Sequence, residues 1–443
     1  MMIVESNETW LGQVPAGWSR NRIRNVATLS PGYSGTPPTV DEFCTIVPME
    51  LLSDDGVIDV SNQVPAEEVQ SGLTLFEQGD VLFAKITPCM ENGKGAFVGK
   101  LPTRYAFGST EFHVLRPSQE VDGQFLYYAT FNPVFRTYAA ENMTGAAGQK
   151  RVSSRFLKDT RLFLPALPEQ QRIAAYLDAS CAAIDAAVAA KRRQLEILDA
   201  LRKSIIQKAV TKGLNLGAVM RDSGSDGLGE IPSHWRTDRM KDVVALRNEK
   251  TDVASEEADY LELEDIESGT GRILNRRNTL EVESAVTLFK TGDILFGKLR
   301  PYLEKYVHAG FDGKCTGEIL AFKPIRLKSR FLFYCIASPW FIGRCNALAY
   351  GAKMPRVNWQ TQLAAFNLPL PPAEEQEAIC GFLDTKLGEL GRIVGSIENQ
   401  IATLTAYRKS LIHECVTGQR RVTDEDVRRA GHRERSQPTE RRA

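Results

Sequence analysis

The sequence predicts an α+β protein in which two similar domains, each a mixed sheet with helices, are separated by two long antiparallel coiled-coil helices. Three observations predict this pseudo-twofold arrangement: an internal duplication with a period of about 206 residues, a heptad pattern at the end of each repeat, and short β-rich runs elsewhere. A chain of 443 residues is long enough for two or three domains at about 150 residues each.

The duplication is clearest where short motifs return in the same order. Gly79-Asp80-Val81-Leu82-Phe83 returns as Gly292-Asp293-Ile294-Leu295-Phe296, and Glu169-Gln170 returns as Glu375-Gln376. From the Glu-Gln motif onward the spacing is strictly 206 residues, and it ends in a shared Arg-Lys-Ser and Val-Thr. The first part of each repeat is therefore variable and the second part more constant.

The variable parts contain short β-rich runs, such as Glu111–Leu115, separated by Gly and Pro, with helical stretches at Gln124–Phe135 and Arg330–Arg344. The constant parts begin with proline-rich segments followed by acidic residues, as at the start of a helix. From Glu169 to Thr211 is 43 residues, or about 64 Å of helix.

Each constant part carries apolar residues at alternating steps of four and three, which predicts a coiled-coil seam between the two helices. The seam residues that we expect are Leu177, Ile184, Val188, Leu195, Leu198, Ile205, Leu383, Leu387, Leu390, Val394, Ile397, Ile401, Leu404 and Leu411.

Proline-rich entries, a Gly/Ser-rich stretch and an Arg-rich end divide the chain. The predicted parts are a first domain (1–165), a first long helix (166–214), a linker (215–229), a second domain (230–371), a second long helix (372–418) and a disordered tail (419–443).

The composition excludes several classes of protein. Lys plus Arg and Asp plus Glu are both 55, so the chain is not a uniformly basic coat protein. No long apolar stretch or signal sequence is evident, which predicts no membrane span and a cytoplasmic protein. The eight cysteines are scattered without a C-x-x-C pair, so we expect reduced thiols and no metal site.

No catalytic motif emerges, so we expect a non-enzymatic chain without a cofactor of its own. There is no phosphate-binding G-x-x-x-x-G-K-[ST] loop, and Asn132-Pro133 is better explained as a helix start than as a base-gripping methyltransferase tetrad. Glu111 and Glu318 occupy matching positions, but a structural hydrogen bond is the better interpretation than a catalytic pair.

Charge distribution gives the one physical indication of a partner. Residues 79–168 carry 11 Lys and Arg against 7 Asp and Glu, and residues 287–370 carry 12 against 4. A basic face on each domain suits DNA phosphates, although such faces are also common on ordinary soluble proteins. The candidate DNA-binding residues are Lys85, Lys150, Arg151, Lys298, Arg300, Lys353 and Arg356.

Two variable domains, each followed by a Leu-Pro…Glu-Gln helix, resemble the specificity subunit of type I restriction–modification systems. Glu169–Ile173 and Glu375–Ile379 match the start of the helices of that family, and Lys85 and Lys298 lie in a recurrent segment of its recognition domains. The resemblance covers residues 13 to about 418.

The resemblance implies that each domain reads one half of a split, asymmetric double-stranded DNA site. The helices would set the distance between the halves and dock two adenine-N6 methyltransferase subunits and, in the restricting form, restriction subunits. S-adenosylmethionine, ATP and Mg²⁺ would then belong to those partners. Half-sites one turn apart need about 34–36 Å, which the predicted helices can span.

Two alternatives remain at this point. One is a non-catalytic coiled-coil scaffold whose variable domains bind proteins, which would leave the basic regions without a role. The other is a nuclease or methyltransferase in its own right, for which the sequence offers no cofactor loop or metal cluster.

Overall fold

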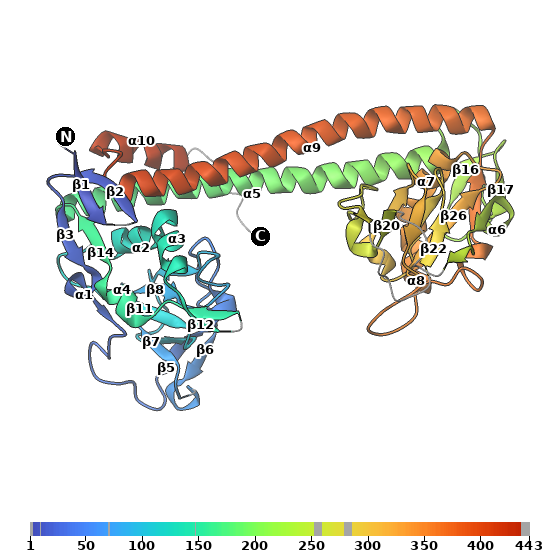
Figure 1. Ribbon diagram of the computed structural model, residues 1–443. Helices are drawn as coiled ribbons and strands as arrows, with labels where there is room; N and C mark the ends of the chain where they lie inside the picture. Colours follow the sequence, from blue (N-terminus) through green and yellow to red (C-terminus); the bar gives the residue numbers. More distant parts are fainter. Residues whose placement is uncertain are drawn as a thin grey trace. The chain divides into compact units, whose positions relative to one another are not determined.

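The structure, a computed structural model, has two compact units, each of which draws on distant parts of the chain (Figure 1). The first is Met1–Lys191 with Asn399–Ala443, and the second is Arg192–Glu398. Both long helices, α5 (Leu167–Lys212) and α9 (Ala373–Val416), contribute one part to each unit. The described residues are 3–8, 10–69, 71–146, 148–251, 259–278 and 286–435.

Two four-stranded sheets form the centre of the first unit. One has the order β6-β5-β10-β7, with β10 parallel to β5, and the other is the antiparallel β4-β11-β8-β9. The strands are β1 (Ile3–Glu8), β2 (Leu11–Pro15), β3 (Ser19–Arg22), β4 (Ala27–Leu29), β5 (Phe43–Val47), β6 (Gln63–Pro65), β7 (Thr74–Phe76), β8 (Val81–Ala84), β9 (Gly95–Phe97), β10 (Ala106–Gly108), β11 (Phe112–Pro117), β12 (Thr144–Ala146), β13 (Gln149–Arg151) and β14 (Arg161–Leu164). The helices besides the long ones are α1 (Ile23–Val26), α2 (Gly123–Phe131), α3 (Pro133–Glu141), α4 (Ser154–Asp159) and α10 (Asp424–Arg435).

The second unit repeats this topology. The sheet β18-β26-β23-β24 corresponds to β4-β11-β8-β9, and β19-β22-β25-β20-β21 again contains one parallel pair, β20 with β25. Its strands are β15 (Met220–Asp222), β16 (Glu230–Pro232), β17 (Arg236–Arg239), β18 (Val244–Leu246), β19 (Lys250–Thr251), β20 (Asp259–Leu261), β21 (Arg277–Asn278), β22 (Val286–Phe289), β23 (Ile294–Gly297), β24 (Tyr306–His308), β25 (Gly313–Cys315), β26 (Ile319–Pro324) and β27 (Asn367–Leu370), and its short helices are α6 (Met240–Val243), α7 (Ser329–Ile336) and α8 (Pro339–Leu348). The predicted α+β fold with an internal repeat is confirmed.

The repeated Gly-Asp-x-Leu-Phe motif forms a turn followed by a buried strand, as the sequence indicated. All residues of β8 and β23 are buried, and helices α2 and α7 pack on the sheets that contain them. Asp80 and Asp293 are 1% and 2% exposed and close the turn, because each carboxylate accepts the backbone amide three residues earlier, at 2.8 Å.

Asn132-Pro133 is a helix start, which confirms the interpretation preferred over a methyltransferase motif. The Asn132 side chain accepts a hydrogen bond from the backbone of Val134 at 3.0 Å, and the proline occupies the first turn of α3. Ser338 and Pro339 begin α8 in the same way.

The recurrent Glu-Gln motif ties each domain to a long helix. The Gln170 side chain is 1% exposed, accepts the backbone amide of Asp122 at 3.0 Å and donates to a proline carbonyl at the helix start. Gln376 does the same with the amide of Lys328, at 2.8 Å. A buried amide group needs partners for both its oxygen and its nitrogen, and the two repeats supply the same ones.

The two long helices pair in antiparallel fashion. In the first unit Tyr176 of α5 lies beneath Arg420, which follows α9, and farther along α5 Asp185 binds Arg408 of α9 at 3.1 Å. Rising numbers on α5 thus meet falling numbers on α9 (Figure 1). In the second unit Ile206 and Leu383 belong to one core cluster. Each of the fourteen seam residues is buried or half-buried.

The tail predicted to be disordered is in part a helix, so that prediction was wrong for residues 424–435. Thr423 and Asp426 form reciprocal side-chain to backbone hydrogen bonds, a capping box at the start of α10. Val422 and Ala430 are 5% and 7% exposed and join the core of the first unit. Residues 436–443 lie outside the described part.

The predicted linker (215–229) also needs correction, because it contains a strand. Residues Met220–Asp222 form β15, which pairs with β16, and Leu228 is 4% exposed. This hairpin precedes the second domain as the β1–β2 hairpin precedes the rest of the first. The Gly/Ser-rich composition of this segment is typical of a linker, so the sequence did not predict the β15–β16 hairpin.

Helix α5 is long and apolar enough, by length and composition alone, to cross a membrane. Its buried apolar residues, among them Leu177, Ile184 and Val188, belong to the core of the first unit. The core helix of a soluble protein passes the same test.

Candidate nucleic-acid interface

The candidate DNA-binding residues gather at one matching place in each unit. Lys85 follows β8 directly and Lys298 follows β23. The backbone amide of Lys85 donates to the carbonyl of Glu111 at 2.9 Å, and that of Lys298 donates to the carbonyl of Glu318 at 3.0 Å. The Lys85 ammonium group also donates to the Thr110 carbonyl, at 2.6 Å.

The strand extensions at these lysines are joined to the segments that carry the candidate arginines. Isolated β-bridges connect Ile86 with Arg151 and Leu299 with Arg356. The amide of the next residue, Val152 or Val357, donates to the carbonyl of Lys85 or Lys298, at 2.8 and 3.0 Å. Because the backbones are joined in the same register, each arginine occupies the same position in its unit.

Both arginines form ion pairs with a glutamate, and sequence reasoning had not connected these residues. Arg151 donates from Nε and Nη2 to Glu111, with a shortest distance of 2.7 Å. Arg356 donates from the same atoms to Glu318, at 3.2 Å each. The hydrogen bond from Arg151 lowers the pKa of Glu111, and burial opposes that shift. The two carboxylates have structural partners, as expected, although the partners come from a loop far along the chain.

The loops next to these arginines differ between the units. In the first unit the hairpin of β12 and β13 carries the exposed Lys150, and Thr87 binds its backbone at 3.0 Å. In the second, Arg300 replaces Thr87: its amide donates to Pro355 at 2.7 Å, and its Nη2 donates to the carbonyl of Lys353 at 3.4 Å. Lys353 is exposed.

Gly145 and Gly351 adopt backbone conformations that these loops require. Their φ angles are +142° and +106°, which favour glycine. A Cβ atom at Gly145 would lie 2.4 Å from the carbonyl oxygen of Gln149. The two glycines are therefore required by the loop conformation itself.

Exposed aromatic and apolar side chains near the second cluster were missed by sequence reasoning. Tyr302 is 54% exposed, Tyr350 is 59% exposed and Met354 is 47% exposed. The signal was present in the sequence as tyrosine and methionine flanking a Gly- and Lys-containing loop. Such side chains can contact base edges or thymine methyl groups.

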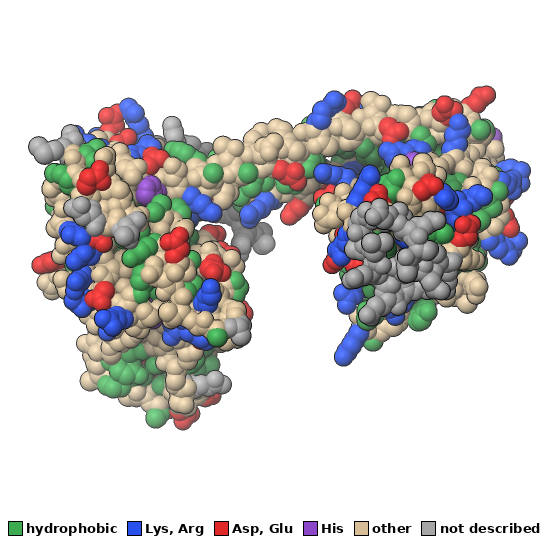
Figure 2. Space-filling model, viewed as in Figure 1, with side chains coloured by type: hydrophobic (Ala, Val, Ile, Leu, Met, Phe, Trp, Pro, Cys, Tyr) green, Lys and Arg blue, Asp and Glu red, His purple; other side chains and the backbone are tan. Residues whose placement is uncertain are grey.

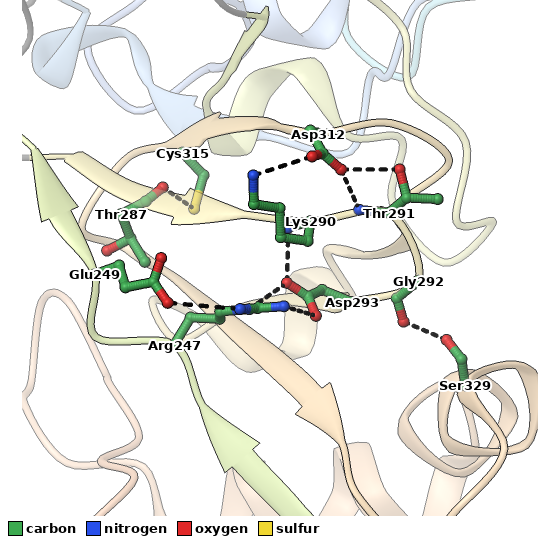
Figure 3. Close-up of polar contacts among 10 residues, drawn as sticks. All are labelled: Arg247, Glu249, Thr287, Lys290, Thr291, Gly292, Asp293, Asp312, Cys315 and Ser329. Atoms are coloured by element: carbon green, nitrogen blue, oxygen red, sulfur yellow. Dashed lines mark hydrogen bonds and ion pairs between the residues drawn. The ribbon is translucent and has the colours of Figure 1, made fainter.

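The Gly-Asp turn leads into β23, the strand that ends just before Lys298. Figure 3 shows Asp293 between the Lys290 backbone and Arg247, whose Nε lies 2.8 Å from the carboxylate. Asp80 binds Arg116 in the first unit, at 2.7 Å. Arg116 lies in β11, whereas Arg247 directly follows β18, so the ion pair recurs although the sequence position does not.

The surface of the second unit carries many basic side chains (Figure 2). In the view of Figure 2, Lys and Arg side chains of the second unit are interspersed with a few acidic side chains. Among the residues that the structure describes, no group of three or more His, Cys, Asp or Glu could hold a metal ion.

A family model described as "Type I restriction modification DNA specificity domain" matches the chain twice, at residues 44–196 and 232–402. The EcoAI specificity subunit of Escherichia coli is 33% identical over 36% of this chain, but the match spans only 27% of that relative. A putative MjaX specificity subunit of Methanocaldococcus jannaschii is 23% identical over 94% of this chain and 96% of its own length.

Two solved structures share the fold. One is a chain from a type I R-M system studied for complex assembly and conformational transition, with a TM-score of 0.65, 16% identity, and coverage of 92% of this chain and 99% of that chain. The other is the HsdS subunit from Thermoanaerobacter tengcongensis, with a TM-score of 0.50, 17% identity, and coverage of 94% and 100%.

Proposed function

Because the chain belongs to the type I restriction–modification DNA specificity family, we propose that it reads a bipartite, asymmetric DNA site and docks its partner enzymes on its long helices. Each unit would read one half of the site. Two adenine-N6 methyltransferase subunits, and restriction subunits in the restricting form, would occupy the helices. The observation that carries this proposal is the recurrence of one basic cluster in two units.

The clusters support reading of two different half-sites. The framework of strand, glutamate and arginine is the same in both, which suits one kind of ligand. The loops at its edge differ, with Lys150 and Thr87 in the first unit and Arg300, Tyr350 and Lys353 in the second. Different side chains present different donors and apolar surfaces to base edges, so the half-sites should differ.

The long helices support docking of proteins. Helix surfaces outside the seam carry apolar side chains that the chain itself does not cover: Ile197 is 66% exposed, Leu201 is 45% exposed and Ile393 is 48% exposed. Exposed apolar side chains on a paired helix favour contact with another protein. Catalysis, S-adenosylmethionine, ATP and Mg²⁺ would then belong to the docked partners, in the cytoplasm.

The alternative, a coiled-coil scaffold whose domains bind proteins, makes a different prediction for DNA. A mobility-shift experiment with the complex of this chain and its methyltransferase, on genomic fragments with competitor DNA, separates the two. The proposed function predicts retention of fragments that share one split sequence. Equal retention of every fragment would contradict the proposed function, and an absence of salt-dependent binding would favour the scaffold.

A further inference from the structure

The Glu–Arg pair is the most closely repeated feature of the two candidate interfaces. In both units a glutamate just before a central strand of the sheet (β11 or β26) holds the Nε and Nη2 atoms of an arginine. In both units the arginine backbone is bridged to the residue after the repeated lysine, Lys85 or Lys298. The neighbouring loop residues, by contrast, differ in size, charge and polarity.

The carboxylate occupies one edge of each guanidinium group and leaves the edge at Nη1 available. Within the described residues, Nη1 of Arg151 and of Arg356 makes no hydrogen bond. The two side chains are 42% and 40% exposed. A guanidinium group held on one edge by a carboxylate is fixed in orientation, so less conformational entropy is lost when the other edge binds a ligand.

We propose that Arg151 and Arg356 contact DNA phosphates and that Glu111 and Glu318 are positioning residues for them. This assignment rests on the proposed function. Two domains that read different bases cannot do so through groups that are identical in type and geometry. The sugar-phosphate backbone is what the two half-sites share, and a planar guanidinium group matches the oxygens of a phosphate. The loop residues that differ between the units, such as Lys150 in the first and Lys353 in the second, would then discriminate between bases.

The test uses the intact complex of this chain with its methyltransferase. Its probes are a duplex that carries the sequence found by methylation mapping and a duplex in which the second half-site is scrambled. Binding is measured over a range of salt concentrations. For Arg356→Gln we expect affinity for both duplexes to fall by the same factor, about fivefold at about 0.15 M salt, and the salt slope to decrease by about 0.9.

The glutamate variant should behave differently. Glu318→Ala leaves the positive charge of Arg356 in place but removes the carboxylate that fixes the orientation of its guanidinium group. We expect the salt slope to be kept while the affinity for both duplexes falls by the same factor, because a mobile guanidinium group loses more conformational entropy when it binds a phosphate. In an Arg356→Gln background, loss of a positioning glutamate should cause no further loss of affinity, whereas loss of a merely structural glutamate would weaken binding again. Arg151→Gln and Glu111→Ala should repeat both results with the first half-site scrambled.

Arg239→Gln is the control, since Arg239 is an exposed arginine of the same unit that pairs with Asp242. It should change neither the salt slope nor the affinity for either duplex. If Arg356→Gln weakens only the cognate duplex and alters the preferred base at one position, the arginine reads a base and the inference is overturned. No change in either duplex would also overturn it. A wild-type complex that does not discriminate the two duplexes would overturn the proposed function instead.

Discussion

Asp293 illustrates how a single buried charge fixes the turn that leads into β23. Its carboxylate is 2% exposed and accepts hydrogen bonds from the Lys290 backbone and from Arg247, whose side chain is 16% exposed. Loss of one partner of such a pair leaves the other buried without compensation. Asp80 and Arg116 have the same relation in the first unit.

For Asp293→Asn we expect the free energy of unfolding to fall by about 3 kcal/mol, because the charge of Arg247 loses its buried counter-ion. Native-state hydrogen exchange at the amides of β23 would measure the change. The control is Asp242→Asn, which breaks an exposed ion pair with Arg239 and should cost less than about 1 kcal/mol. Equal effects of the two variants would contradict this account of the turn.

We expect His113 to make the stability of the first unit sensitive to acid. Burial lowers its pKa below the usual 6.5, and its Nε2 lies 2.8 Å from the carbonyl oxygen of Val152, next to Arg151. The neutral ring is thus favoured in the folded chain. As pH falls below about 6.5, the unfolded chain takes up the proton more readily, so the folded state loses stability.

The substitution His113→Leu tests this, since Leu320 occupies the matching place in the second unit. Denaturant unfolding at about pH 7.5 and about pH 5.5 should show a smaller loss of stability for the variant than for the wild type. His308 and His413, whose pKa values burial also lowers, keep part of the dependence. An unchanged difference between the two pH values would mean that His113 does not contribute.

At the residue scale the duplication in the sequence predicted which basic residues occupy equivalent positions in the two units: Lys85 with Lys298, and Arg151 with Arg356. It did not predict the partners of Arg151 and Arg356. Glu111 precedes Arg151 by forty residues, and their contact arises only when the hairpin of β12 and β13 folds back beside the sheet. An ion pair between residues that are distant in the sequence depends on how the strands and loops pack in the folded chain, and local sequence patterns do not predict that packing.

At the scale of elements, the heptad pattern predicted both long helices and their seam, because a periodic apolar face has one favourable way to be buried. The sequence did not predict α10 or β15. Both lie in segments whose composition is typical of flexible chain. Specific contacts that composition does not reveal stabilise them: the Thr423–Asp426 capping box begins α10, and β15 pairs with β16.

The seam makes a prediction about assembly. Ile397 is 8% exposed and Leu404 is half-buried. Replacing both with glutamate should separate α5 from α9 and abolish co-purification of the methyltransferase, while the sheets of both units keep their protection in hydrogen exchange. Ala402→Glu is the control, because Ala402 is exposed on the same helix. Retention of the complex by the double variant would contradict the pairing of the helices.

At the scale of the whole molecule, the repeat period predicted two units but not their composition. The units are not the two halves of the sequence, because each includes parts of both long helices. Antiparallel pairing explains this: the end of α9 returns to the start of α5 and thereby to the first domain. The tail after α9 joins the first unit for the same reason, through Arg172 and Asp424 at 3.2 Å.

The central claim is that this chain selects the DNA sequence and that each unit selects one half of it. The most direct measurement is a genome-wide map of N6-methyladenine in the host with the gene, without it, and with residues 13–165 exchanged for those of a relative. We expect one split, asymmetric motif to lose methylation on deletion and the exchanged chain to change only one half of that motif. An unchanged map on deletion, or an exchange that altered both halves, would contradict the account.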